Sequence, residues 1–182
     1  RRVRYGGIST DGKTAYLTVS QAQQSVPEPG VTGDQPSSWA QAEVAEARQK
    51  GLIPQELDSQ YQTNITRAQF SAMLFRYLGL NESDYASVQL PFADNRSIPS
   101  YAVPAVKALY SKGIINGSTG ADGKLYFNPN ASLTRAQAAT MIGRTQEKGY
   151  ATTALTFSDA ASIPSYATYY IQTMVAQGVI SG

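Results

Sequence analysis

The sequence predicts a mainly α-helical fold of tandem two-helix repeats, preceded by a short β-hairpin. The first observation is that Phe92–Gly117 aligns without a gap with Phe157–Gly182. The second is that ITRAQFSAMLFR, at residues 65–76, matches LTRAQAATMIGR, at residues 133–144. The third is that a glycine follows the helical pattern in each copy. Such self-similarity is the signature of a repeat architecture.

Composition excludes several classes of function. The chain has 182 residues, 42% of them hydrophobic, which is enough to bury a core. Its 15 basic and 13 acidic residues give a net charge of +2 without charged runs, so nothing predicts binding to nucleic acid or to an anionic membrane surface. No window approaches the roughly 18 continuous apolar residues of a membrane span, so no insertion in a membrane is expected. No cysteine or histidine is present, which excludes disulfides, thiol nucleophiles and Ser-His-Asp catalysis. The cysteine count is compatible with an exported protein of a Gram-positive bacterium and with a cytosolic one.

The repeats divide the chain into four predicted segments. Residues 1–35 form a hairpin and a linker, or the tail of a preceding domain. Residues 36–84 are the first repeat, 90–149 the second, and 155–182 a third that lacks its second helix. Apolar surface meant for that helix is then left open, so we expect residues 1–35 or another molecule to cover it. Self-association through this incomplete repeat is one such arrangement.

The N-terminal segment reads as two strands joined by a tight turn. Val3–Val19 alternates in the way of strands around Asp11-Gly12, a strong hairpin signal. Ser25–Ser38 is rich in Pro, Gly and Ser and is predicted to be a linker.

The first helix of each repeat has predicted start and stop signals. A serine is the expected N-cap, and a glycine about 13 residues later is the expected left-handed C-cap residue. These residues are Ser38 and Gly51, Ser100 and Gly113, and Ser165 and Gly178. Apolar residues recur between them at helical spacing. In the second repeat a loop rich in Gly, Asn, Asp and Ser follows at Asn116–Ser132.

The second helix begins at a capping box in two repeats. Thr66 and Gln69, like Thr134 and Gln137, have the spacing at which a threonine hydroxyl and a glutamine side chain satisfy each other's backbone amides. The expected apolar stripes are Phe70, Met73, Leu74, Tyr77 and Leu78 in the first repeat, and Ala138, Met141 and Ile142 in the second.

The capping box does not explain Arg67 or Arg135. Each sits at the first helical position, where the helix dipole presents about half a positive charge and disfavours a cation. Free amides, the dipole and a guanidinium together favour an anion site for a carboxylate or phosphate. The alternative is an ion pair with an acidic side chain of a neighbouring repeat, such as Asp94 or Asp159.

Residues 36–182 resemble the surface-layer homology (SLH) family. The resemblance rests on F-x-D, S-[WY]-A, a helix ending K-G-[IL], a glycine-rich loop, N-P-N and [IL]-T-R-A-Q, a variant of the family's TRAE tetrapeptide. It implies a non-enzymatic anchoring module at the cell wall of a bacterium, outside the cell. The family's repeats pack as a pseudo-threefold bundle, here incomplete, whose grooves bind secondary cell-wall polysaccharide, often with acidic, pyruvylated sugars.

The resemblance implies a set of ligand-binding residues. The tetrapeptide arginines are expected to contact the ligand, and the full candidate set is Arg67, Arg135, Gln137, Gly117, Ser118, Trp39, Tyr101 and Tyr166. Two departures from the family pattern matter. Gly117-Ser118 stands where Gly-Tyr is usual, which removes an aromatic platform. Leu52–Asn64 lacks the glycine-rich loop, so the groove of Arg67 is expected to be vestigial.

Other recurring residues have two readings each. Trp39, Tyr101 and Tyr166 either stack on sugar or plug the core. Asp94 and Asp159 are expected to close the turn before a helix by bonding their own backbone. A glycosidase needs two acids facing one cleft, whereas these two occupy equivalent positions of different repeats. We therefore expect no enzyme activity and no catalytic residues.

Two functions remain as hypotheses. The first is a wall anchor that binds polysaccharide, and the alternative is a protein assembly module with ion-paired arginines and no glycan binding. No cofactor is implied. The loop around Asp122 lacks the alternating acids of a calcium-binding loop, so no metal site is expected.

Overall fold

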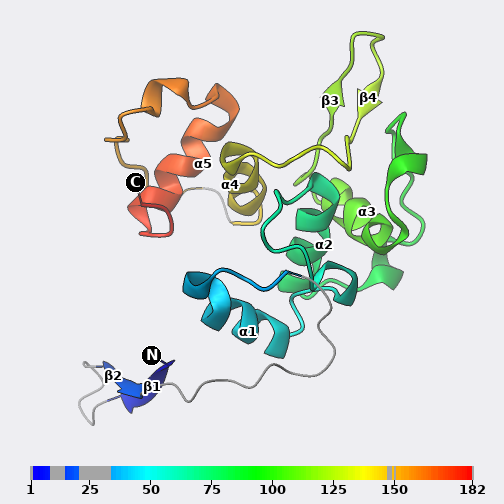
Figure 1. Cartoon of the computed structure of the whole chain (residues 1–182). Coiled ribbons are helices and arrows are strands. Elements are labelled where there is room, and N and C mark those ends of the chain that lie inside the picture. Colours follow the sequence, from blue (N-terminus) through cyan, green and yellow to red (C-terminus); the bar gives the residue numbers. More distant parts are fainter. Residues whose placement is uncertain (1, 9–14, 21–33, 147–148, 150, 182) are drawn as a thin grey trace. The chain divides into compact units, whose positions relative to one another are not determined.

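The computed structural model describes residues 2–8, 15–20, 34–146, 149 and 151–181, and the mainly helical prediction is confirmed (Figure 1). These residues contain five α-helices and two antiparallel two-stranded sheets. The chain divides into two compact units, residues 1–50 with 58–62 and residues 51–57 with 63–182. The predicted pseudo-threefold arrangement and the repeat boundaries stay predictions.

The N-terminal unit contains the predicted hairpin and the helix α1 (Gln41–Gln49). Strands β1 (Arg2–Ile8) and β2 (Ala15–Ser20) pair antiparallel, with a bulge in β1 between Tyr5 and Ile8. The two predicted strands are therefore confirmed. The predicted turn at residues 11–12 and most of the predicted linker lie outside the described residues.

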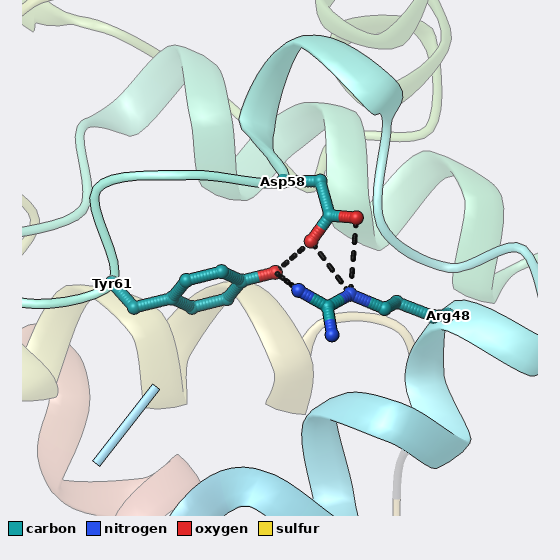
Figure 2. Close-up of polar contacts among 3 residues, drawn as sticks. All are labelled: Arg48, Asp58 and Tyr61. Atoms are coloured by element: carbon teal, nitrogen blue, oxygen red, sulfur yellow. Dashed lines mark hydrogen bonds and ion pairs between the residues drawn. The ribbon is translucent and has the colours of Figure 1, made fainter. Parts of the chain in front are cut away.

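A polar cluster ties α1 to the loop segment of the same unit. Figure 2 shows the Arg48 guanidinium meeting the Asp58 carboxylate and the Tyr61 hydroxyl. Arg48 Nε donates to Asp58 Oδ1 at 2.7 Å and to Oδ2 at 3.0 Å, and Tyr61 Oη donates to Asp58 as well. Burial, aided by the hydrogen bond to Asp58, raises the pKa of Tyr61 to about 12. Because all three groups satisfy one another, the cluster fixes the loop on the helix.

The second unit holds the remaining regular elements. Helix α2 (Arg67–Tyr77) is followed by α3 (Val103–Ser111). A hairpin of β3 (Ser118–Thr119) and β4 (Leu125–Tyr126) then leads to α4 (Arg135–Gly143). Helix α5 (Ser165–Ala176) packs beside α4 (Figure 1). The hairpin, with strands of two residues each, lies within the predicted loop at Asn116–Ser132.

Two hydrophobic clusters hold this unit together. The larger joins α2, α3 and the loop before α4, and Leu109 and Phe127 at its centre are 0% exposed. The smaller joins α4 to α5 through Ala139, Ala167, Ile171 and Met174. Both second helices are thus placed by a neighbouring first helix.

The serine N-caps were predicted wrongly. Helices α1 and α3 are preceded by 3-10 turns at Ser38–Ala40 and Ser100–Ala102, and no serine side chain caps these starts or that of α5. The backbone closes each start instead, since the amides of Ala102 and Ala167 each donate at 2.9 Å to a carbonyl, that of Pro99 or Pro164. The serine thus occupies the first helical position, because the residue before it already has the extended cap conformation.

The predicted helix ends are confirmed. Gly51, Gly113 and Gly178 have φ of +66°, +70° and +71°. Each follows the C-cap residue of α1, α3 or α5. A side chain at this backbone conformation is strained, which is why glycine marks the stop.

The predicted stripes of the second helices were partly wrong. In α2 the buried residues are Ala68, Ser71, Ala72 and Leu74, and in α4 they are Ala139, Thr140, Met141 and Gly143. Tyr77, predicted to be inside, is 67% exposed. Small residues are buried because neighbouring segments approach closely: a Cβ on Gly143 would lie 2.4 Å from Tyr170 Cδ1.

Candidate functional site

Both capping boxes form as predicted. At α2 the Gln69 amide donates to Thr66 Oγ1 at 3.2 Å, and the Thr66 amide donates to Gln69 Oε1 at 2.8 Å. Thr134 and Gln137 make the same exchange at α4. The local sequence therefore sets the direction in which each arginine leaves its helix.

The first amides of α2 do not form the expected anion site. The amide of Arg67 donates to the Ala131 carbonyl at 3.0 Å, and that of Ala68 to the Pro129 carbonyl at 3.0 Å. An isolated bridge also pairs Thr66 with Ser132. The loop of the second repeat thus occupies the helix start, so at α2 any anion must be met by side chains.

The Arg67 side chain crosses the same loop. Its Nε donates to the Phe127 carbonyl at 2.7 Å, and its guanidinium carbon lies 5.2 Å from the centroid of the Phe127 ring. Burial lowers the pKa of Arg67, and the fields of Tyr166 and Asp94 oppose that shift. Among the described residues no hydrogen bond or ion pair engages its two terminal nitrogens.

The ion pairs with Asp94 and Asp159, the alternative to an anion site, are absent from the described part of the chain. Asp94 instead accepts hydrogen bonds from the amides of Phe127, at 2.9 Å, and Asn128, at 2.7 Å. This corrects the expectation that Asp94 bonds its own turn. The Asp94 carboxylate therefore holds a loop that lies 33 residues further along the chain, and Arg67 donates to the Phe127 carbonyl of the same loop.

A groove of about 520 Å³ opens beside Arg67 in the second unit. Five of the predicted ligand residues line it, namely Arg67, Gly117, Ser118, Gln137 and Tyr166. The loop of the second repeat, rather than one from the first, lines this groove together with Arg67, so the lack of a glycine-rich loop at Leu52–Asn64 does not leave Arg67 without a loop beside it. Gly117, at φ +74°, brings the backbone so close that a Cβ would lie 2.7 Å from Phe92 Cε1.

The three predicted aromatics have different settings. Tyr166 is 49% exposed and reaches the groove from the start of α5. Tyr101 packs against the larger cluster, and burial raises its pKa. Trp39, 81% exposed, belongs to the N-terminal unit. Tyr166 alone among them lines the groove, where it supplies an aromatic surface that Ser118 does not.

Two groove residues escaped the sequence analysis. Arg144 lines the groove, donates from its Nη1 to the Ile114 carbonyl at 3.1 Å and lies 5.9 Å from the Tyr170 ring centroid. Asn128 donates to Ser118 Oγ at 3.1 Å. The repeated stretch ends in arginine in both copies, at Arg76 and Arg144, and this recurrence was the signal that could have found Arg144.

Arg135 has different surroundings. It donates from Nη2 to the Ser181 carbonyl at 3.1 Å and lines a separate pocket of about 870 Å³. None of the other predicted ligand residues lines that pocket. Five of the eight predicted residues thus line the groove beside Arg67, whereas Arg135, Trp39 and Tyr101 do not.

Among the described residues, no group of three or more Asp and Glu side chains is arranged to hold a metal ion. The Asp122 carboxylate accepts from the Lys124 amide at 3.1 Å and the Tyr126 hydroxyl at 2.8 Å. In the same part of the chain, every helix is too short or too polar to span a membrane.

Comparison with known families matches two segments of the chain, residues 91–139 and 156–182, to the S-layer homology domain. These segments include the loop of the groove, the second TRAQ helix start and α5. The match therefore covers the lining of the pocket beside Arg135 and part of the groove lining, whereas Arg67 and Arg144 lie outside it.

Comparison with individual proteins finds relatives that are much longer. An amylopullulanase of Thermoanaerobacterium thermosulfurigenes is 32% identical over 152 residues, which is 80% of this chain and 8% of the relative. Endo-1,4-beta-xylanase A of Thermoanaerobacterium saccharolyticum is 37% identical over 111 residues, 59% of this chain and 9% of the relative. An endoglucanase of Bacillus sp. (strain KSM-635) is 39% identical over 84 residues, which is 46% of this chain and 8% of the relative. The similarity thus concerns a small part of each relative.

Proposed function

Because this chain carries S-layer homology repeats and is a non-catalytic module for anchoring at the bacterial cell surface, we propose that it binds an acidic secondary cell-wall polysaccharide in the groove beside Arg67. The observation that carries the proposal is the chemistry of the groove lining. Two arginines and no acidic residue line it. An anionic ligand is therefore favoured over a neutral or cationic one.

The remaining lining suits a sugar. Ser118, Asn128 and Gln137 offer hydroxyl and amide groups, and Tyr166 offers an exposed ring. Carbohydrate hydroxyls need donors and acceptors, and an aromatic face packs on the apolar side of a sugar ring. A carboxylate on the sugar, such as that of a pyruvate ketal, would meet the terminal nitrogens of Arg67 in the paired geometry that a guanidinium favours.

The test is a pull-down of the chain on purified cell walls, before and after the secondary polymer is stripped. Binding should be lost with the polymer and should be competed by pyruvylated oligosaccharide, but not by its neutral counterpart. Retention on stripped walls at the original level would contradict the proposal.

Variants locate the binding site. Tyr166→Ala should weaken wall binding about tenfold without loss of folding, because the ring is half exposed. Arg76→Gln is the matched control for Arg67, because Arg76 is an exposed cation of α2 that does not line the groove. Equal wall binding by Tyr166→Ala and the unaltered chain would place the ligand elsewhere.

The alternative, a protein assembly module, has lost one of its supports. Neither Arg67 nor Arg135 makes an ion pair among the described residues. It still predicts retention on walls that depends on protein and not on polymer, so the same pull-down separates the two functions.

A further inference from the structure

Asn116 is a groove residue that the proposed function leaves unused. It lines the groove beside Arg67, is exposed, and makes no side-chain hydrogen bond among the described residues. Gly117 follows it, and this is the one Asn-Gly pair in the sequence. In such a pair the next backbone nitrogen reaches the asparagine side chain most easily, because glycine has no Cβ to hinder the approach. The pair therefore has the chemistry for an intramolecular reaction.

The fold keeps the Gly117 nitrogen unengaged and requires glycine at this position. Its amide donates to no acceptor among the described residues. Its φ is +74°, and a Cβ here would lie 2.7 Å from Phe92 Cε1 and 2.9 Å from the Tyr126 carbonyl oxygen. A larger residue would be strained and would collide with its neighbours. The unhindered nucleophile is thus part of the groove's construction.

Three other asparagines lack this combination. Asn95 donates from its side chain to a backbone carbonyl at 2.9 Å. Asn128 also donates from its side chain, and it is followed by a proline, which has no amide hydrogen to lose. The amide that follows Asn130 donates to the Asn128 carbonyl at 3.2 Å. In each case the side chain or the next nitrogen is already engaged or blocked.

The remaining two asparagines are exposed but have hindered neighbours. Ile65 follows Asn64, and Glu82 follows Asn81. A side chain on the attacking residue restricts its backbone and slows ring closure, because the nitrogen must come into contact with the asparagine Cγ. Asn116 is therefore expected to react faster than every other asparagine of the chain.

A carboxylate at position 116 would change the charge of the groove. Arg67 and Arg144 are the charged residues of its lining. Arg144 Nη1 donates to the carbonyl of Ile114, two residues before Asn116. A negative charge beside these guanidiniums attracts them and repels an anionic ligand. An acidic sugar should therefore bind more weakly once the side chain has reacted.

We propose that Asn116 is a site of spontaneous deamidation that lowers the affinity of the groove for acidic polysaccharide. The Gly117 nitrogen loses its proton to hydroxide and attacks Asn116 Cγ. A C–N bond forms there, the bond from Cγ to the side-chain nitrogen breaks, and ammonia leaves with a proton from water. Water then opens the cyclic imide. Opening at the side-chain carbonyl gives aspartate, and opening at the backbone carbonyl gives isoaspartate, whose backbone is longer by one methylene.

The first experiment follows the reaction without any ligand. The chain is kept for days in warm, mildly alkaline buffer and is then digested for mass spectrometry. The peptide that contains Asn116 should gain the mass difference between a hydroxyl and an amino group, and an isoaspartate-specific methyltransferase should label it. The gain should be at least about tenfold faster than at Asn81 and within about tenfold of that in the synthetic peptide GIINGSTG, residues 113–120.

The second experiment measures the effect on binding, which rests on the proposed function. Asn116→Asp should bind purified cell walls about tenfold more weakly than the unaltered chain. Asn81→Asp is the matched control, because it makes the same charge change at an exposed residue outside the groove. The aged chain should lose wall binding in proportion to its modified fraction. Asn116→Gln should keep its own initial binding on ageing, because the longer side chain would have to close a larger ring.

Each half of the proposal can be overturned separately. A mass gain at Asn116 no faster than at Asn81, or far slower than in the peptide, would show that the fold protects this side chain. Wall binding by Asn116→Asp and by the aged chain equal to that of the fresh chain would refute the effect on the groove. If the fresh chain does not bind walls at all, the proposed function fails together with that effect, whereas the mass measurement still decides whether Asn116 reacts.

Discussion

Arg67 and Arg135 occupy identical tetrapeptides and identical capping boxes, yet their surroundings differ. Around Arg67, the loop through Phe127 buries its phenylalanine ring in the larger cluster, and two carbonyls of this loop accept hydrogen bonds from the first amides of α2. Around Arg135, the same kinds of group line an open pocket. The difference teaches that TRAQ determines how the helix begins, whereas the segment that packs against it determines what the arginine can bind.

The largest expected contrast concerns the two phenylalanine environments. Phe127→Ala should lower the free energy of unfolding by about 3–5 kcal/mol, because it empties a fully buried site. Phe157→Ala should cost about 1 kcal/mol, because its ring is only partly buried beside an open pocket. Urea denaturation of both variants checks this, and similar losses would mean that the pocket beside Arg135 is filled.

The two aspartates give the next contrast. Asp94→Ala removes a charged acceptor from two amides, one of them on the buried Phe127, and should lower the free energy of unfolding by about 2 kcal/mol. Asp159→Ala should change it by less than about 0.5 kcal/mol, because the side chain is exposed. Thermal melts in parallel provide the measurement. A marked loss from Asp159→Ala would show that its carboxylate already has a structural partner.

The arginines themselves should separate stability from binding. Arg67→Gln loses the bond to the Phe127 carbonyl and the contact with its ring, so we expect a loss of about 1–2 kcal/mol in stability. The binding of this variant to cell walls, measured per folded molecule, should fall more than about tenfold, because the charge-assisted pair between the guanidinium and the sugar carboxylate is lost. Arg135→Gln should leave stability within about 0.5 kcal/mol, because this side chain is exposed.

That forecast reverses the ranking that the sequence alone suggests. A larger loss of wall binding from Arg135→Gln than from Arg67→Gln would restore the original ranking and make the pocket beside Arg135 the principal polysaccharide site. Arg76→Gln accompanies both variants as the control for removing one cation.

How much of this was predictable depends on sequence distance. The capping boxes and the glycine stops join residues no more than a few positions apart, and both were predicted correctly. The groove beside Arg67 is lined by residues of three predicted repeats. The sequence analysis grouped the glycine-rich loop of the second repeat with Arg135 of the same repeat, whereas this loop packs beside Arg67. Local spacing carries no information about which repeat supplies that wall.

Two local predictions failed for a different reason. A serine at a helix start satisfies the N-cap rule, yet Pro99 and Pro164 already hold the extended conformation before it. Apolar periodicity placed Tyr77 inside, whereas the buried face of α2 is made of small residues. A periodic apolar pattern is recognised mainly from its large side chains. Segments that pack closely together, however, have room only for small side chains between them.

The smallest expected effect tests the comparison at single amides. The Ala68 amide donates to the Pro129 carbonyl, and Ala68 is 0% exposed, so its hydrogen exchange should be slowed by about a hundredfold or more. The equivalent Ala136 amide has no acceptor among the described residues and should exchange within about tenfold of an unstructured peptide.

The amides of Gln69 and Gln137 are both capped by threonine and serve as references within each helix. Equal protection at Ala68 and Ala136 would show that both helix starts are covered, and the open pocket beside Arg135 would then have to be abandoned.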